Sequence, residues 1–141
     1  MTTDRLMVDT WAWLALNDED DADHEVAVIA NDELLDLDYI FVTTNFILDE
    51  TYTLLRRRIS ARHAIQFGQD IQQAMQSGAL EVITIGPEIE AEAWRLFETY
   101  HEVSGLSYTD CTTFAAMQRL KITDVFTADD HFSMMGFVKH P

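Results

Sequence analysis

The chain has 141 residues, of which 48% are hydrophobic and 11% aromatic, so it is long enough to bury the core of one globular domain. Its 25 acidic and 9 basic residues give a formal net charge of −16, and such a surface repels nucleic acids and membranes unless metal ions or a local basic patch intervene. No apolar run approaches the roughly 20 residues of a membrane span, and the first residues lack the apolar segment of a signal peptide. Because Cys111 is the single cysteine, an internal disulfide is excluded, and we expect a cytoplasmic protein with one domain over residues 1–141.

The first part of the chain alternates short apolar runs with helical patterns. In residues 22–37 the apolar residues Val26, Ile29, Ala30 and Leu34 recur at spacings of three and four, which indicates an amphipathic helix with these side chains in the core. In chain order we expect a strand at 5–8, helices at 10–16 and 22–37, a strand at 39–42, and a helix at 45–58 capped by Thr44 or Asn45.

The second part continues the same alternation. We expect a helix at 60–76 ending at Gly78, a strand at 79–85, a helix from Pro87 to Tyr100, a helix opened by Ser107, and strands at 125–127 and 136–140. The expected buried positions of the first two of these helices are Ala64, Phe67, Ile71 and Met75, and Ile89, Ala93, Leu96, Phe97 and Tyr100. Strands that alternate with helices predict an α/β fold, in which one parallel sheet is flanked by helices on both faces.

Two carboxylates stand directly after expected strands. Asp9 follows the first strand and Asp129 lies just beyond the strand at 125–127. In an open parallel sheet the carboxyl ends of the strands share one edge, and ligand sites form outside that edge. We therefore expect Asp9 and Asp129 to lie at a common site.

Two further carboxylates belong to helices that follow strands. Ser107 and Asp110 have the spacing of a capping box, which places Asp110 in the first turn of its helix, where the helix dipole favours a negative charge. Glu50 shares a helix face with Phe46, Ile47 and Leu54, and a Glu in an apolar stripe is costly unless it is paired or binds a cation.

Four carboxylates at one edge predict a metal site. They repel one another when no counter-charge is present, and a divalent cation removes that penalty. Ligand sets made only of oxygen favour Mg²⁺ or Mn²⁺ over zinc. The histidines are scattered along the chain, and we expect surface or structural roles for them, with His131 the only one near a candidate site residue.

These motifs together resemble a known family. The segments VDT at 8–10, LSYTDC at 106–111 and FTADDHF at 126–132, with Glu50 between them, resemble the PIN domain, and in particular the VapC-type toxins of prokaryotic toxin–antitoxin pairs. The resemblance covers nearly the whole chain in length, motif order and spacing. It implies a PIN-like parallel sheet flanked by helices, an endoribonuclease that depends on Mg²⁺ or Mn²⁺, a homodimer, and inhibition by a small cognate antitoxin protein.

The same resemblance assigns roles residue by residue. Asp9, Glu50, Asp110 and Asp129 match the four acids of the family, which serve as catalytic and metal-binding residues, and Asp130 is the alternative to Asp129 for the fourth. Residues that contact and orient these acids, without binding the metal themselves, are expected at Thr10, Asn45, Thr127 and Asp130.

The basic patch and the class of function leave alternatives open. Arg56, Arg57, Arg58 and Arg62 either form a rim that contacts RNA phosphates or are a solvated helix end that complements its dipole. Besides an endoribonuclease, the sequence is compatible with a catalytically inactive PIN-like module that binds proteins, or with a structure-selective DNA nuclease.

Overall fold

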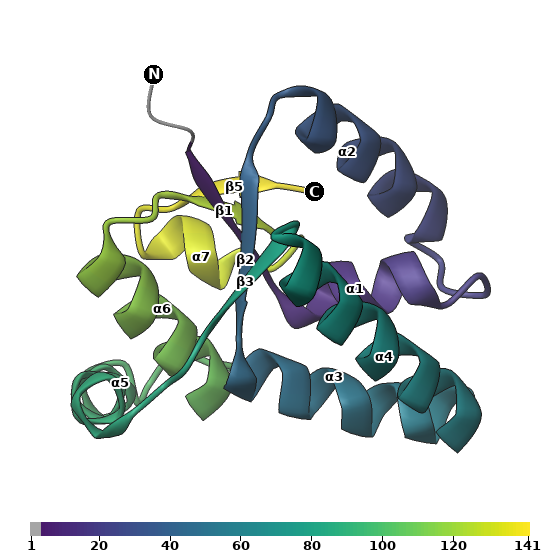
Figure 1. Cartoon of the computed structure of the whole chain (residues 1–141). Coiled ribbons are helices and arrows are strands. Elements are labelled where there is room, and N and C mark those ends of the chain that lie inside the picture. The colour runs from purple at the N-terminus through teal and green to yellow at the C-terminus, as the bar shows by residue number, and fades with distance from the viewer. Residues whose placement is uncertain (1–3) are drawn as a thin grey trace.

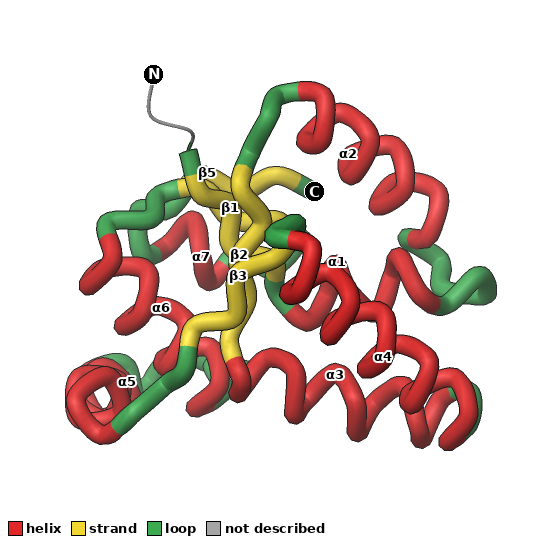
Figure 2. Tube along the Cα trace, viewed as in Figure 1, coloured by secondary structure: helices red, strands yellow, loops and turns green. Residues whose placement is uncertain are grey.

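The computed structural model of the chain describes residues 4–141, and its five strands form one parallel sheet (Figures 1 and 2). The strand order is β3-β2-β1-β4-β5, and each neighbouring pair is parallel. The strands are β1 (Arg5–Val8), β2 (Ile40–Thr44), β3 (Leu80–Ile83), β4 (Asp124–Phe126) and β5 (Val138–His140). The expectation of a parallel α/β fold is confirmed.

Helices cover both faces of this sheet (Figure 1). Leu6 and Val8 of β1 pack on one face against α1 (Thr10–Asn17) and α2 (His24–Asp36), and α4 (Ala61–Ser77) covers β3 on the same side. On the other face, Met7 packs against α6 (Tyr108–Leu120), α7 (His131–Met134) and Ile47 of α3 (Asn45–Arg58). The remaining helix, α5 (Pro87–Thr99), packs on α6. Within residues 4–141, none of the helices has the length and apolar character that crossing a membrane requires.

Capping residues that are recognisable in the sequence set several helix boundaries. Thr44 begins α3 by accepting a hydrogen bond from the Ile47 backbone N–H, which decides between the two expected caps. Ser107 and Asp110 form the expected capping box at the start of α6. Gly78 ends α4 in the left-handed conformation at φ +80°, which glycine adopts without steric cost.

Some of the expected core positions are wrong. In α2 the expected Ala30 and Leu34 are buried, but Val26 and Ile29 are 52% and 60% exposed, and Ala27 is buried instead. Helical periodicity gives the spacing of apolar residues, but it does not tell which of two adjacent apolar stripes faces the core. Here the small side chains of the alanines allow α2 to pack closely against the sheet. Met75, near the end of α4, is exposed, and Phe97 of α5 packs at the surface against Trp94 and Tyr108.

Phe114 tests the packing of the core beneath the site. Its ring is fully buried and contacts the rings of Phe132 and Phe137. We predict that Phe114→Ala lowers the free energy of unfolding by about 3–5 kcal/mol, because it leaves a cavity that neighbours fill only in part. Urea unfolding followed by circular dichroism measures this. As a control, Ile65→Ala on the exposed side of α4 should change it by less than about 1 kcal/mol.

Candidate active site

The central pair of strands brings Asp9 and Asp129 together at the carboxyl edge of the sheet. In the β1–β4 register Val8 pairs with Phe126, so Asp9 follows one strand where Thr127 follows the other. The Thr127 hydroxyl donates to Asp9 Oδ2 at 2.9 Å and accepts from the Asp129 backbone N–H at 3.1 Å. Thr127 therefore fixes the position of one acid and of the loop that carries the other.

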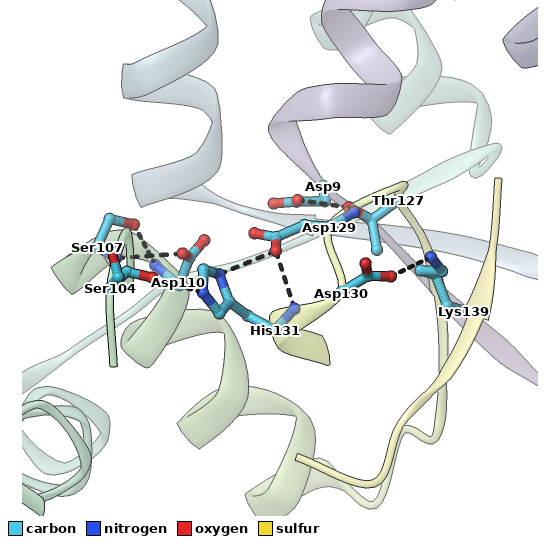
Figure 3. A network of polar contacts seen from close by, with 9 residues as sticks. All are labelled: Asp9, Ser104, Ser107, Asp110, Thr127, Asp129, Asp130, His131 and Lys139. Carbon is cyan, nitrogen blue, oxygen red and sulfur yellow. Dashed lines mark hydrogen bonds and ion pairs between the residues drawn. The ribbon is translucent and has the colours of Figure 1, made fainter. Parts of the chain in front are cut away.

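Asp110 reaches the same place from the start of α6. Its Oδ2 accepts from the Ser107 backbone N–H at 3.2 Å, and its own N–H donates to the Ser107 hydroxyl at 3.0 Å, so the capping box orients the carboxylate. Ligand atoms of Asp110, Asp129 and His131 all lie within 4.8 Å of one another. In Figure 3 the carboxylates of Asp9, Asp110 and Asp129 point toward a common space.

Glu50 joins this group from α3. Its Oε2 accepts a hydrogen bond from the Thr10 hydroxyl at 3.1 Å, and Thr10 is the residue after Asp9. Thr10 and Thr127 thus each donate a hydrogen bond to a candidate acid, and their supporting role stays a prediction. Asn45 has a different place, because its side-chain oxygen accepts from the Ile85 backbone N–H at 2.8 Å and holds the segment after β3.

The structure separates Asp129 from its neighbour Asp130. The Asp130 side chain is 90% exposed and pairs with Lys139 Nζ at 2.6 Å (Figure 3). The hydrogen bond and charge of Lys139 lower the pKa of Asp130, so this carboxylate is already neutralised by a protein cation. The geometry favours Asp129 as the fourth acid and leaves Asp130 outside the group.

Comparison with known proteins identifies the family. The family described as "PIN domain" matches residues 6–138. The chain belongs to the PIN domain family. Its resemblance to VapC-type toxins is confirmed as well, since the curated relatives carry that name.

Two relatives and two solved structures show how similar this PIN domain is to known proteins. It is 31% identical over 134 residues to "23S rRNA-specific endonuclease VapC20" of Mycobacterium tuberculosis, covering 95% of this chain and 96% of the relative. It is 32% identical to "VapC ribonuclease" of Archaeoglobus fulgidus, covering 67% of this chain and 56% of the relative. The crystal structure of VapC20, described as a Sarcin-Ricin loop cleaving toxin, aligns with a TM-score of 0.80 at 31% identity, covering 94% of this chain and 96% of that one. FitAcB from Neisseria gonorrhoeae aligns with a TM-score of 0.67 at 13% identity over 96% of each chain, which supports the fold alone.

Burial and mutual repulsion perturb the acids of this PIN domain. Asp9 is only 6% exposed, and its burial raises the pKa of the carboxyl from 3.8 to about 7, with the charges of Asp110 and Asp129 adding to the rise and the Thr127 hydrogen bond opposing it. Burial likewise raises the pKa of Asp110 to about 6, where the Ser107 hydrogen bonds oppose and the charges of Asp129 and Glu50 add. Among residues 4–141, no cation counts among the causes that shift the pKa values of Asp9 and Asp110, so ionisation of all these acids at neutral pH is unfavourable.

A divalent cation fits this arrangement. Asp9 is a buried carboxylate facing two other acids, and three ligand atoms from Asp110, Asp129 and His131 stand close enough to share one ion. The donors are carboxylate oxygens together with one imidazole. The cluster is therefore compatible with a hard or borderline divalent metal.

His131 is the member of the cluster for which the sequence analysis expected a surface or structural role, although it lies two residues after Asp129. It is the first residue of α7, and its backbone N–H donates to Asp129 Oδ1 at 2.9 Å, which turns the ring back toward Asp129. Burial lowers the pKa of this imidazole, but the Asp129 charge and the Ser104 carbonyl contact outweigh it, so the net shift is upward. The sequence contains one signal for this contact. An Asp side chain often accepts a hydrogen bond from the backbone N–H two residues later, and His131 lies two residues after Asp129.

The arginine patch lies away from the acids. Arg56, Arg57 and Arg58 form the last turn of α3, with Arg57 about 10 Å further along the axis than Glu50. Arg58 pairs with Asp21 at 3.7 Å, and Arg56 lines a groove with Tyr52 between α3 and α4. The structure places this patch at the far end of the helix whose start adjoins the site.

Asp9→Asn tests the electrostatic strain of the site. Because the pKa of Asp9 is higher in the folded state than its ordinary value, the metal-free protein loses stability as the pH rises from about 4 to about 7. Asn cannot ionise and can still accept from Thr127, so in EDTA at pH 8 we expect the variant to be more stable than the wild type by at least about 1 kcal/mol, with a weaker dependence on pH. Thermal unfolding from pH 5 to pH 8 measures this.

The matched control is Asp49→Asn, on the exposed side of α3. It should leave the difference between pH 5 and pH 8 unchanged. A destabilised Asp9→Asn protein in EDTA at pH 8 contradicts the assignment of Asp9 as a strained, uncompensated acid.

Proposed function

We propose that this protein is a divalent-metal-dependent endoribonuclease that hydrolyses RNA phosphodiester bonds, the toxin of a VapC-type toxin–antitoxin pair. Membership of the PIN family and full-length similarity to a 23S rRNA-specific endonuclease support the class of reaction. The observation that carries the proposal is the convergence of Asp9, Asp110 and Asp129 at one sheet edge with raised pKa values for the first two. Residues 1–141 would act as one nuclease domain in the cytoplasm.

The four acids have two different roles in the proposed reaction. Asp9, Asp110 and Asp129 would hold Mg²⁺ or Mn²⁺, and such an ion would supply a Lewis acid for a phosphodiester oxygen and for water. Glu50, fixed by the Thr10 hydroxyl, orients the attacking water and accepts its proton. Thr127 holds Asp9 and the Asp129 loop in register throughout. The water oxygen attacks phosphorus in line with the P–O3′ bond, which breaks; the 3′-oxygen takes up a proton from solvent, and the other fragment keeps a 5′-phosphate.

RNA is the substrate class that the relatives support. VapC20 is described both as 23S rRNA-specific and as cleaving the Sarcin-Ricin loop, so ribosomal RNA is the first substrate to try. A net charge of −16 makes approach of RNA depend on the metal and on Arg56, Arg57, Arg58 and Arg62.

A cognate antitoxin and a second copy of the chain are the proposed protein partners. Large apolar side chains are exposed on several helices, among them Ile29 and Leu35 of α2 and Trp94 of α5. Exposed apolar groups of this size commonly mark surfaces that another protein covers. A homodimer and an antitoxin complex are the two assemblies that the proposal includes.

Replacement of the acids tests the nuclease proposal. We predict that Asp110→Asn and Asp129→Asn each reduce cleavage of ribosomal RNA by at least about 100-fold, because each removes a charged ligand from the reacting centre. Both should also reduce the rise in melting temperature that Mn²⁺ produces in the wild type. Asp130→Asn is the matched control and should cleave at close to the wild-type rate, since Asp130 pairs with Lys139.

The same assay separates the rival functions. Cleavage of structured DNA but not of RNA by the wild-type protein would favour a DNA nuclease. Absence of cleavage together with an unchanged melting temperature in millimolar Mn²⁺ would favour a catalytically inactive binding module.

A second prediction concerns the arginine patch. If these arginines bind phosphates, the combined substitution Arg56→Gln, Arg57→Gln and Arg62→Gln should raise KM at an unchanged kcat. The slope of log KM against log salt concentration should fall by about 0.7 for each phosphate of single-stranded RNA that the variant no longer neutralises. Lys121→Gln, at the end of α6 far from Ser107, is the control and should leave the slope unchanged. An unchanged slope in the triple variant identifies the patch as a solvated helix end.

A further inference from the structure

His131 connects the two loops that carry Asp110 and Asp129. Its ring Nε2 lies 2.9 Å from the backbone carbonyl oxygen of Ser104, in the segment that leads into α6. Its Nδ1 lies 2.9 Å from Asp129 Oδ1. Figure 3 shows the ring between these two partners, with Asp110 beside it. The imidazole is thus held from both sides at the edge of the acidic cluster.

These contacts define which ring nitrogen can serve as a ligand. A carbonyl oxygen only accepts hydrogen bonds, so Nε2 carries the hydrogen, and Nδ1 of the neutral ring has a free lone pair. Nδ1 is shielded from solvent and has no hydrogen-bond partner among residues 4–141, because its close contact with Asp129 is poorly aligned for one. A buried lone pair that faces a carboxylate oxygen is unfavourable unless a proton or a metal ion lies between the two atoms, and a metal ion would take the place of the proton that Asp129 favours on this ring.

The spacing of these atoms suits a shared metal ion. Two ligand atoms about 2.1 Å from one ion, at a right angle to each other, lie about 3.0 Å apart in octahedral geometry. The observed separation of Nδ1 and Asp129 Oδ1 is 2.9 Å, and a carboxylate oxygen of Asp110 lies within 4.8 Å of the ligand atoms of both residues. His131 and Asp129 therefore have the separation of adjacent ligands of one ion.

Two contacts hold the ring in this place. Nε2 contacts the Ser104 carbonyl oxygen, and the backbone N–H of His131, the first residue of α7, donates to Asp129 Oδ1. The ring therefore has little freedom to move away from Asp129. Contacts of this type, in which one ring nitrogen donates to a backbone carbonyl, orient metal-binding histidines in general.

We propose that His131 Nδ1 is a ligand of the metal held by Asp110 and Asp129, and that this nitrogen makes the site prefer Mn²⁺ to Mg²⁺. Imidazole binds divalent transition ions well, whereas Mg²⁺ favours ligand sets made of oxygen. The inference rests on the proposed function, because it specifies the metal of the same centre. The ligand set is then made of carboxylate oxygens and one imidazole nitrogen, whereas the sequence led us to expect oxygen ligands only.

Pulsed electron paramagnetic resonance of Mn²⁺ bound to the whole chain, without RNA, tests the nitrogen ligand directly. The wild-type spectrum should contain ¹⁴N coupling from imidazole, and labelling with ¹⁵N-histidine should convert it into ¹⁵N coupling. His131→Gln should bind Mn²⁺ without this coupling. His101→Gln, which replaces an exposed histidine next to Glu102, is the control and should keep it.

Competition calorimetry provides the second measurement. We expect His131→Gln to reduce the preference for Mn²⁺ over Mg²⁺ about tenfold, mainly through weaker Mn²⁺ binding. Bound Mn²⁺ without nitrogen coupling, or equal losses for both ions, would show that His131 only pairs with Asp129, and would overturn this inference while leaving the proposed nuclease intact. Failure of the wild type to bind Mn²⁺ at all would overturn both.

Discussion

The buried carboxylate of Asp9 is the constraint on which the rest of the site depends. It lies at the end of the central strand, shielded from water and next to Asp110 and Asp129, so the folded chain tolerates its charge poorly. The hydroxyl of Thr127 provides one hydrogen bond from the neighbouring strand, which is too little to compensate three converging acids. A cation at this position would offset the repulsion among these acids.

The sequence predicted much of this arrangement because the relevant signals are local. Asp9 follows an apolar strand, Ser107 and Asp110 have the spacing of a capping box, and a parallel sheet gathers strand ends at one edge. Glu50 was predicted from its place in an apolar stripe, and it is held there by Thr10. The roles of these residues stay predictions, but their proximity is a feature of the fold.

Other features were outside the reach of local patterns. Val26 and Ile29 share their period with Ala27 and Ala30, and only the approach of α2 to the sheet decides which pair is buried. The sequence favoured Asp129 over Asp130, but it could not predict that Asp130 pairs with Lys139 of β5. A surface or structural role was expected for His131, because its contact with Ser104 links segments that are distant in sequence. Each of these depends on tertiary contacts that no spacing rule contains.

Hydrogen bonds from the chain itself orient three of the acids. One oxygen of Asp9 accepts from Thr127, one of Glu50 from Thr10, and one of Asp110 from the Ser107 backbone. Each carboxylate is thereby pre-organised, so that little side-chain entropy remains to be lost when a ligand contacts it.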